Sequence, residues 1–327
     1  MHLQTVTPAQ HWAKRRKILV TGGCGFIGSA LVRKLVAAGE SVIALDSMRF
    51  GNLHNLGDAL QQVKTLRFQI GVDDLKEVAH ELSDVTHAFH LAAEKSNQPS
   101  ATSADFFRGN IEGMHTLISL LCQSGLLKVV FTSSLYAYGR HVGGPLCEDE
   151  LAQPNTLYGM SKLAGENLLG FFRREYHLEA CGLRVFFTYG PRQFPGSGYK
   201  SVIIKNFERI LDGRPPVIFG DGQQALDYIF VDDVVDALLA AMVSSADQNV
   251  INVGSGVGTT IERLTDMMLD VAGSALKPEF AAADWTAGTT RVADRAKAAE
   301  LLHWEPTTTL RHGLGQTLVW MKERVKV

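Results

Sequence analysis

The sequence has 327 residues, of which 46% are hydrophobic and 20% charged, a composition typical of a globular protein with one large or two modest domains. Its 32 lysines and arginines nearly balance its 34 aspartates and glutamates, so no strong net field favours nucleic acid or an anionic membrane as a partner. No stretch approaches the roughly 20 apolar residues that a membrane-spanning helix needs, and we expect a cytoplasmic protein with no membrane or nucleic-acid partner.

The four cysteines are far apart and form no CxxC pair. This spacing argues against a zinc site and against a disulfide framework, so we expect free thiols and no metal. Two acidic pairs, Asp73-Asp74 and Asp232-Asp233, fit helix N-termini better than metal sites. Residues 1–16 are polar and partly basic, and we interpret them as a polar extension rather than a signal peptide.

The predicted elements alternate between strand and helix from Lys17 onward. Lys17–Thr21 is a short apolar run that stops at glycines, which is typical of a buried parallel strand. Phe26–Ala38 is predicted to form a helix that ends at Gly39, and Ser41–Leu45 the next strand. The remaining predicted elements are strands at Ala88–Ala92, Lys128–Thr132 and Ala180–Phe187 and helices at Phe106–Cys122 and Leu157–Tyr176. This alternation indicates a parallel sheet covered by helices on both faces.

The chain changes character after residue 188, where proline and glycine become frequent. We therefore predict that the main sheet domain spans residues 17–188, with a later contribution from about 228–254. Residues 189–227 and 255–327 would form a smaller C-terminal domain.

The first predicted strand ends in the segment Thr21-Gly22-Gly23-Cys24-Gly25-Phe26-Ile27-Gly28, with glycines at GxxGxxG spacing. The first glycine permits a tight turn, the second lets the backbone approach a pyrophosphate, and the third lets helix and strand pack closely. The start of the helix then presents free N–H groups to the phosphates. The pattern predicts a dinucleotide site.

An acid at the end of the next strand supports this prediction. Asp46 follows Gly28 by 18 residues, where a carboxylate can accept hydrogen bonds from the adenine ribose and repel a 2′-phosphate. Arg49 lies close enough to weaken the preference for NAD over NADP, but Asp46 still favours NAD. The predicted contacts of NAD in this region are Gly22, Gly25, Phe26, Ile27, Gly28 and Asp46.

A candidate catalytic pair opens the helix at Leu157–Tyr176. Tyr158 and Lys162 are four residues apart, so their side chains lie on the same helix face. A phenol is a poor base at neutral pH, but a nearby ammonium and a cationic nicotinamide ring favour the phenolate and make it usable in acid–base catalysis. Ser134, after the preceding strand, could hydrogen-bond the same substrate oxygen.

With these motifs the chain resembles the extended short-chain dehydrogenase/reductase family, in its nucleotide-sugar epimerase and dehydratase branch. The resemblance runs from Lys17 to about Leu314. It is carried by TGGCGFIG (Thr21–Gly28), HLAAEKS (His90–Ser96), NIEG (Asn110–Gly113), TSSLYAYG (Thr132–Gly139), YGMSK (Tyr158–Lys162), LRVFFTYGPRQ (Leu183–Gln193), GDGQQALDYIFVDD (Gly220–Asp233), INVGSG (Ile251–Gly256) and HWEP (His303–Pro306).

The resemblance implies a fold, a cofactor and an assembly. The fold class is α/β, a Rossmann-type doubly wound parallel sheet that binds NAD, with a smaller C-terminal α/β domain that binds substrate. The chain would form a homodimer through the helices at Phe106–Cys122 and Leu157–Tyr176. Ser134, Tyr158 and Lys162 match the catalytic positions of the family. Further cofactor contacts implied by the resemblance are Leu91, Ala92, Ala93, Lys95, Asn110 and Ser133, together with Tyr158 and Lys162.

The two residues after Ser134 indicate which reaction of the family is run. Sugar dehydratases typically carry acids there, and UDP-glucuronate decarboxylases commonly keep a glutamate, whereas this chain has Leu135 and Tyr136. Without those acids elimination is disfavoured, and a UDP-sugar 4-epimerase that works through a 4-keto intermediate becomes the leading hypothesis. A ketoreductase or dehydrogenase, a dehydratase, an oxidoreductase on a non-nucleotide substrate and an inactive NAD-binding scaffold remain alternatives.

Two positions depart from the family pattern for holding the substrate. Phe187 stands where the family commonly has an asparagine, and Leu226 where an arginine normally holds the diphosphate. An arginine–phosphate contact is charge-assisted, so its loss should either weaken nucleotide binding or pass the role to another residue. Arg291 is the first candidate for that role, with Arg192 and Lys200 behind it. Asn206 is a further residue that could face the sugar. The predicted substrate contacts are Lys95, Ser134, Phe187, Gln193, Tyr199 and Arg291.

Overall fold

The computed structural model describes residues 16–94, 102–139, 143–193, 200–246 and 250–325. Seven strands form the central sheet: β1 (Lys17–Thr21), β2 (Ser41–Asp46), β3 (Lys64–Arg67), β4 (His87–His90), β5 (Lys128–Ser134), β6 (Glu179–Val185) and β10 (Val250–Val253). All of their pairings are parallel, in the order β10-β6-β5-β4-β1-β2-β3. The strand order reverses between β1 and β4, which is the switch point of a doubly wound sheet.

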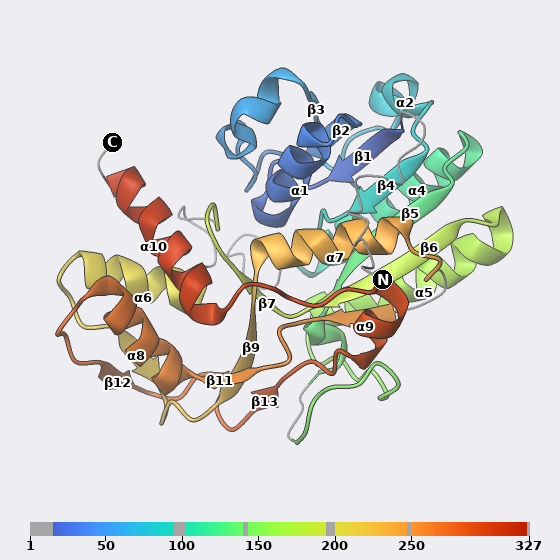
Figure 1. Ribbon diagram of the computed structural model, residues 1–327. Coiled ribbons are helices and arrows are strands. Elements are labelled where there is room, and N and C mark those ends of the chain that lie inside the picture. The colour runs from blue at the N-terminus through green and yellow to red at the C-terminus, as the bar shows by residue number, and fades with distance from the viewer. Residues whose placement is uncertain (1–15, 95–101, 140–142, 194–199, 247–249, 326–327) are drawn as a thin grey trace, which may run out of the picture.

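Helices cover both faces of this sheet (Figure 1). On one face lie α1 (Phe26–Ala37) and α7 (Val231–Val243), and on the other α2 (Lys76–Leu82), α4 (Gly113–Gln123) and α5 (Leu157–Tyr176). Because side chains alternate along a strand, Ile18 and Val20 join the core under α1 and α7, whereas Leu19 joins the core under α4 and α5. The predicted Rossmann-type α/β fold is confirmed.

A second layer of structure lies below the sheet in Figure 1. One small sheet contains β7 (Phe187–Tyr189), β9 (Ala225–Phe230), β11 (Gly258–Thr260) and β13 (Thr290–Arg291), and a second pairs β8 (Val217–Phe219) with β12 (Glu279–Ala281). The helices of this region are α6 (Val202–Leu211), α8 (Ile261–Ala272), α9 (Ala296–Leu302) and α10 (Leu310–Val325). The predicted domain boundaries stay a prediction.

The predicted strand Ala180–Phe187 was wrong at its end. β6 stops at Val185, Phe186 is buried in a small separate core, and Phe187 starts β7, which pairs with β9 in the other sheet. The apolar run is continuous in sequence, so only the position of β9 reveals the break. Of the stretch predicted to return to the main sheet, about 228–254, α7 covers one face of that sheet and β10 joins it, while β9 belongs to the small sheet.

Three local features also differ from the sequence-based expectation. The helix expected at Phe106–Cys122 begins one turn earlier as α3 (Ser103–Asp105) and continues as a π-helix, η3 (Phe106–Glu112), before α4. The edge strand β3 was missed because its sequence KTLR has no apolar pattern and its side chains are exposed or half-buried. A 3₁₀ segment, η2 (Leu53–Gln61), also follows β2.

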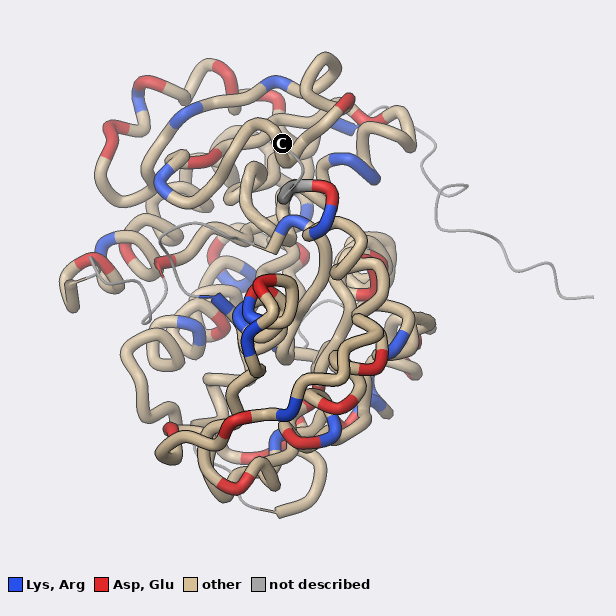
Figure 2. The backbone as a smooth tube through the Cα atoms, turned by 90° about the vertical axis from the view of Figure 1, so that its left-hand side faces the viewer, with Lys and Arg blue, Asp and Glu red and all other residues tan. Residues whose placement is uncertain are grey.

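Charge and hydropathy of the folded chain add two findings. Within the described ranges, no helix combines the length and apolar character needed to cross a bilayer. Basic and acidic residues are interspersed along the backbone in Figure 2. The cellular location stays a prediction.

Candidate active site

A cavity of about 660 Å³ lies at the carboxyl ends of the central strands. It runs from the glycine-rich turn after β1, past the ends of β4 and β5, to β7, β8 and β9 of the small sheets. Doubly wound sheets bind ligands in the crevice outside these strand ends, at the switch point. The predicted cofactor and catalytic residues that line the cavity are Gly22, Gly25, Phe26, Ile27, Gly28, Asp46, Leu91, Ala92, Ala93, Asn110, Ser133, Ser134, Tyr158 and Lys162.

The glycine-rich turn has a backbone that only glycine allows. Gly22 has a φ of +67°, and its N–H donates to the carbonyl of Leu45 at 2.8 Å. A Cβ at Gly28 would lie 2.0 Å from the carbonyl oxygen of Gly22. No side chain caps α1 at Gly25, so its first N–H groups stay open towards the cavity. This bare, close-packed helix start fits the pyrophosphate of a dinucleotide.

Asp46, at the end of β2, stabilises this turn through hydrogen bonds. Its carboxylate accepts hydrogen bonds from the backbone N–H groups of Cys24 (3.0 Å) and Met48 (2.9 Å), and the side chain is buried. Burial raises the pKa of Asp46, and the backbone hydrogen bonds oppose that rise. The structure therefore places Asp46 at the cavity, as predicted, with much of its carboxylate already committed to the loop.

Asn110, on η3, holds the wall opposite the turn. Its amide oxygen accepts from the Glu94 N–H at 2.7 Å, and its amide nitrogen donates to the Glu94 carbonyl at 3.0 Å and to the Ser161 hydroxyl at 2.9 Å. These contacts join the segment after β4 to α5. The Asn110 side chain thus shapes the cavity, and its contact with a cofactor stays a prediction.

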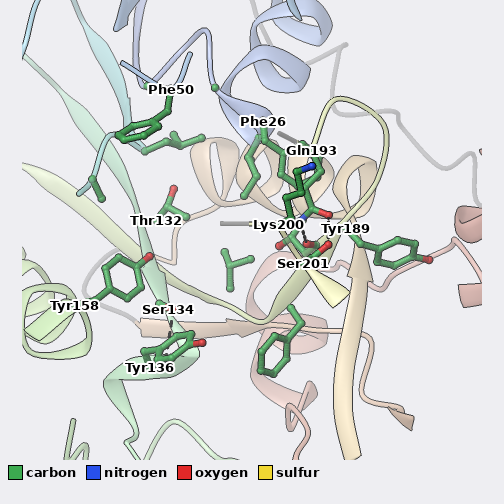
Figure 3. Close-up of a pocket in the computed structure, with 18 of the residues that line it drawn as sticks. Phe26, Phe50, Thr132, Ser134, Tyr136, Tyr158, Tyr189, Gln193, Lys200 and Ser201 are labelled. Carbon is green, nitrogen blue, oxygen red and sulfur yellow. Dashed lines mark hydrogen bonds between the residues drawn. The ribbon is translucent and has the colours of Figure 1, made fainter. Parts of the chain in front are cut away.

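The predicted catalytic trio lines the cavity, and Figure 3 shows Ser134 and Tyr158 on the same side of it. Ser134 ends β5, and Tyr158 and Lys162 lie on the first turns of α5. The Lys162 ammonium is buried, donates to the Thr132 carbonyl at 2.7 Å, and lies 5.7 Å from the centre of the Tyr158 ring. The helix positions of Tyr158 and Lys162 and the hydrogen bond from Lys162 to the Thr132 carbonyl hold the ammonium near the phenol.

Burial raises the pKa of Tyr158 to about 12, and the nearby Ser134 hydroxyl partly opposes this rise. The phenol is therefore protonated at neutral pH in the protein alone. A further positive charge beside it is needed to stabilise the phenolate. This requirement fits a site that binds a cationic nicotinamide ring.

The far end of the cavity combines aromatic and apolar side chains with basic ones, which include Arg192, Lys200 and Lys205. Phe187 packs against Tyr228 with ring centres 6.0 Å apart, and both rings line the cavity together with Leu226. Gln193 also lines it, but its amide donates to the Thr188 carbonyl at 2.8 Å and accepts from Ser201 at 2.7 Å. Lys95 and Tyr199, the other two predicted substrate contacts, lie outside the described residues.

Arg291 lies behind this wall. It is buried on β13 opposite Leu226 of β9, and its guanidinium stacks 5.7 Å from the Tyr136 ring and 5.1 Å from the Trp285 ring. Both rings line the cavity, and Tyr136 also contacts the Tyr158 ring edge-on, with centres 5.8 Å apart. Two guanidinium nitrogens, Nε and Nη1, have no hydrogen-bond partner among the described residues. Burial lowers the pKa of Arg291, as expected for a cation that lacks an anion.

Comparison with known proteins places this site in a family. Residues 18–254 match the model of the NAD dependent epimerase/dehydratase family. A UDP-glucose 4-epimerase of Mycolicibacterium smegmatis is 34% identical over 312 residues, which cover 94% of this chain and 99% of that enzyme. The chain belongs to the NAD dependent epimerase/dehydratase family. The resemblance found in the sequence is confirmed.

Solved structures agree with this family. A UDP-glucose 4-epimerase from Thermotoga maritima, solved with UDP-glucose, superposes with a TM-score of 0.88 at 36% identity, covering 94% of this chain and 99% of that one. A UDP-glucuronic acid 4-epimerase from Bacillus cereus, solved with UDP-glucuronic acid and NAD, gives a TM-score of 0.83 at 28% identity over 94% and 99% of the two chains.

Trp285 and Glu94 are among the cavity residues that sequence reasoning missed. Trp285 lies in an irregular segment whose sequence carries no motif, and only the fold brings it to Tyr136. Glu94 lies inside the HLAAEKS motif but was passed over in favour of Lys95. Glu94 lines the cavity, and its carboxylate pairs with Arg49 at 2.6 Å.

Proposed function

We propose that this protein is an NAD-dependent nucleotide-sugar 4-epimerase that acts on a UDP-sugar. The observation that carries the proposal is the meeting of Ser134, Tyr158 and Lys162 beside a cavity that starts at a bare, glycine-rich helix N-terminus. Family membership supports the cofactor and the reaction class. The glycine-rich turn and the ends of β2 and β4 would hold NAD.

NAD held there would supply the hydride chemistry at carbon 4 of the sugar. Tyr158 takes the proton of the 4-hydroxyl as that carbon is oxidised, and gives it back to the oxygen on reduction. Lys162 stabilises the phenolate through its fixed ammonium, and the Ser134 hydroxyl hydrogen-bonds the reacting oxygen. Hydride transfer back to the opposite face of the 4-keto sugar would invert that carbon.

The residues after Ser134 favour epimerisation over elimination. Leu135 is buried and apolar, and the Tyr136 ring packs against Tyr158 and Trp285. Neither side chain is a carboxylic acid that could remove a proton from a carbon next to the ketone. The keto intermediate is therefore reduced again instead of losing water.

The diphosphate would be held by Arg291 in place of the missing arginine at Leu226. The two positions are neighbours in the register of β9 and β13, so a cation on one strand can serve almost the same place as a cation on the other. The two unpartnered nitrogens of Arg291 leave a charge-assisted donor pair for a phosphate, reached past the rings of Tyr136 and Trp285.

The second small layer of the fold would then be the substrate domain, and the active form a homodimer. Helices α4 and α5 lie side by side on one face of the sheet (Figure 1). Phe107 on η3 and Met160 on α5 are 56% and 50% exposed, apolar side chains that a second copy would cover. Sedimentation of the purified protein would report the dimer.

The decisive experiment uses the purified protein without added cofactor. It should contain bound NAD and equilibrate UDP-glucose with UDP-galactose, or another epimeric UDP-sugar pair, as followed by chromatography. Tyr158→Phe should keep the NAD and lose the exchange. If no pair in a panel of UDP-, dTDP- and GDP-sugars exchanges, the epimerase proposal fails. Net reduction or oxidation of the nicotinamide by a sugar without a nucleotide would instead favour the oxidoreductase alternative that Phe187 and Leu226 suggest.

A further inference from the structure

The cofactor end of the cavity contains two acidic side chains, Asp46 and Glu94, which differ in how fully their carboxylate oxygens are hydrogen-bonded. Asp46 uses its carboxylate on the backbone N–H groups of Cys24 and Met48. Glu94, on the segment after β4, pairs through Oε1 with Arg49 at 2.6 Å. Its Oε2 is buried and has no hydrogen-bond partner among the described residues.

Hydrogen bonds hold the backbone of Glu94 in place, which restricts the positions that its unpartnered Oε2 can take. Asn110 accepts from its N–H and donates to its carbonyl, at 2.7 and 3.0 Å. The side chain of Glu94 is 15% exposed and lines the cavity. A buried carboxylate oxygen without a donor is costly, so the site calls for a ligand group with an O–H or N–H.

The position of Glu94 Oε2 in the cavity indicates which ligand group it would contact. Arg49 follows Asp46 by three residues, so the Arg49–Glu94 pair lies beside the end of β2. Phe50, labelled in Figure 3, lines the same cavity, with its ring 5.5 Å from the Arg49 guanidinium. In doubly wound dinucleotide sites the adenosine ribose lies at the end of this strand. Its 2′- and 3′-hydroxyls are the donors within reach of that region.

We propose that Glu94 is a second acid that binds the adenosine ribose, and that its pairing with Arg49 sets the selectivity for NAD over NADP. The inference rests on the NAD site of the proposed function. Glu94 Oε2 accepts a ribose hydroxyl, whereas a 2′-phosphate in that place would meet a carboxylate. The same carboxylate forms an ion pair with Arg49. Without that pair, the Arg49 guanidinium could bind the 2′-phosphate, as arginines do in NADP enzymes.

Nucleotide selectivity can be measured without any sugar. The purified protein is exchanged to equilibrium against equal concentrations of NAD⁺ and NADP⁺, freed of unbound nucleotide by gel filtration, and its bound nucleotides are quantified by mass spectrometry. Glu94→Gln keeps the shape of the side chain but removes its charge. We expect the ratio of bound NADP to bound NAD to rise about tenfold in this variant, the scale of one additional charge-assisted hydrogen bond.

A second variant separates the two parts of the inference. In Glu94→Gln combined with Arg49→Gln, the released cation is gone, and the increase in NADP should largely disappear. Glu81→Gln is the matched control, because it also breaks an acid–base pair, with Lys64, but lies outside the cavity lining. It should leave the ratio unchanged.

An unchanged ratio in Glu94→Gln would overturn the inference. An increase of equal size in the double variant would overturn the part assigned to Arg49. Because the readout is the bound nucleotide, a protein that proves inactive on every UDP-sugar would refute the proposed function and leave this test intact.

Discussion

Glu166 on α5 binds Arg184 on β6 through two hydrogen bonds of 2.9 and 2.8 Å, and both side chains are 5% exposed. The same carboxylate accepts a hydrogen bond from Ser133, the neighbour of Ser134 on β5. The ion pair therefore ties α5, the helix that carries Tyr158 and Lys162, to β6, and the Ser133 hydroxyl ties the same carboxylate to β5, the strand that carries Ser134.

Removing one partner of this pair should be far more costly than removing the hydroxyl that joins it. Glu166→Gln leaves the buried charge of Arg184 without a counter-charge, and we expect a loss of about 3–5 kcal/mol of unfolding free energy. Ser133→Ala keeps the ion pair and should cost about 1 kcal/mol. Urea denaturation measures both. Equal losses in the two variants would contradict the dominant role of the ion pair.

Arg291 should affect substrate binding more than chemistry. In Arg291→Gln the KM for the UDP-sugar should rise about tenfold while kcat changes less, because a charge-assisted phosphate contact is lost in the ground state and the transition state alike. Steady-state kinetics measures the split.

A relocated arginine offers the matched control for that variant. Leu226 is the register neighbour of Arg291, so Leu226→Arg in the Arg291→Gln background returns a cation to nearly the same place. A lower KM in the double variant than in Arg291→Gln is expected. A fall in kcat alone in Arg291→Gln, with KM unchanged, would place Arg291 outside the substrate contacts.

The glycine-rich turn should not tolerate a methyl group at Gly28. Its Cβ would lie 2.0 Å from the Gly22 carbonyl oxygen, so the turn must move, and we expect Gly28→Ala to lose bound NAD and about 1–3 kcal/mol of stability. A Cβ at Gly315, on α10, would meet no described atom within 4 Å, so Gly315→Ala should keep NAD and stabilise the helix by about 0.5–1 kcal/mol. The absorbance of the nucleotide released on denaturation and thermal melting measure the two effects. NAD retained in Gly28→Ala would contradict the assignment of the turn.

Acid should destabilise the protein through His90. Burial, helped by the Lys162 charge, lowers the pKa of His90 from 6.5 to about 3. The unfolded chain therefore binds a proton between these values that the native state does not. Between pH 6.5 and pH 4 this histidine alone should remove about 3 kcal/mol of unfolding free energy.

The contribution of His90 can be isolated by comparing slopes. His90→Asn should flatten the dependence of unfolding free energy on pH in that window, whatever its effect at pH 7. His54→Asn, at an exposed position, should keep the slope of the wild type. Identical slopes in all three proteins would show that other groups cause the acid loss.

The sequence alone determined the fold class and predicted the cofactor turn and the catalytic trio. Each rests on short-range chemistry: glycine spacing fixes the turn at Gly22–Gly28, and a four-residue separation puts Tyr158 and Lys162 on one helix face. Ser134 could be added because the ends of parallel strands meet at one edge of a sheet.

Only the tertiary structure decided which charges are already paired. The sequence shows both Asp46 and Arg49 but not their partners. In the fold, Asp46 accepts a hydrogen bond from the glycine-rich loop, whereas Arg49 pairs with Glu94 from the segment after β4. In the same way, the fold leaves Arg291 buried, with two guanidinium nitrogens unpartnered among the described residues, beside Trp285, which comes from a segment without a motif. Pairing of this kind depends on contacts between residues far apart in the chain, and local sequence patterns do not encode it.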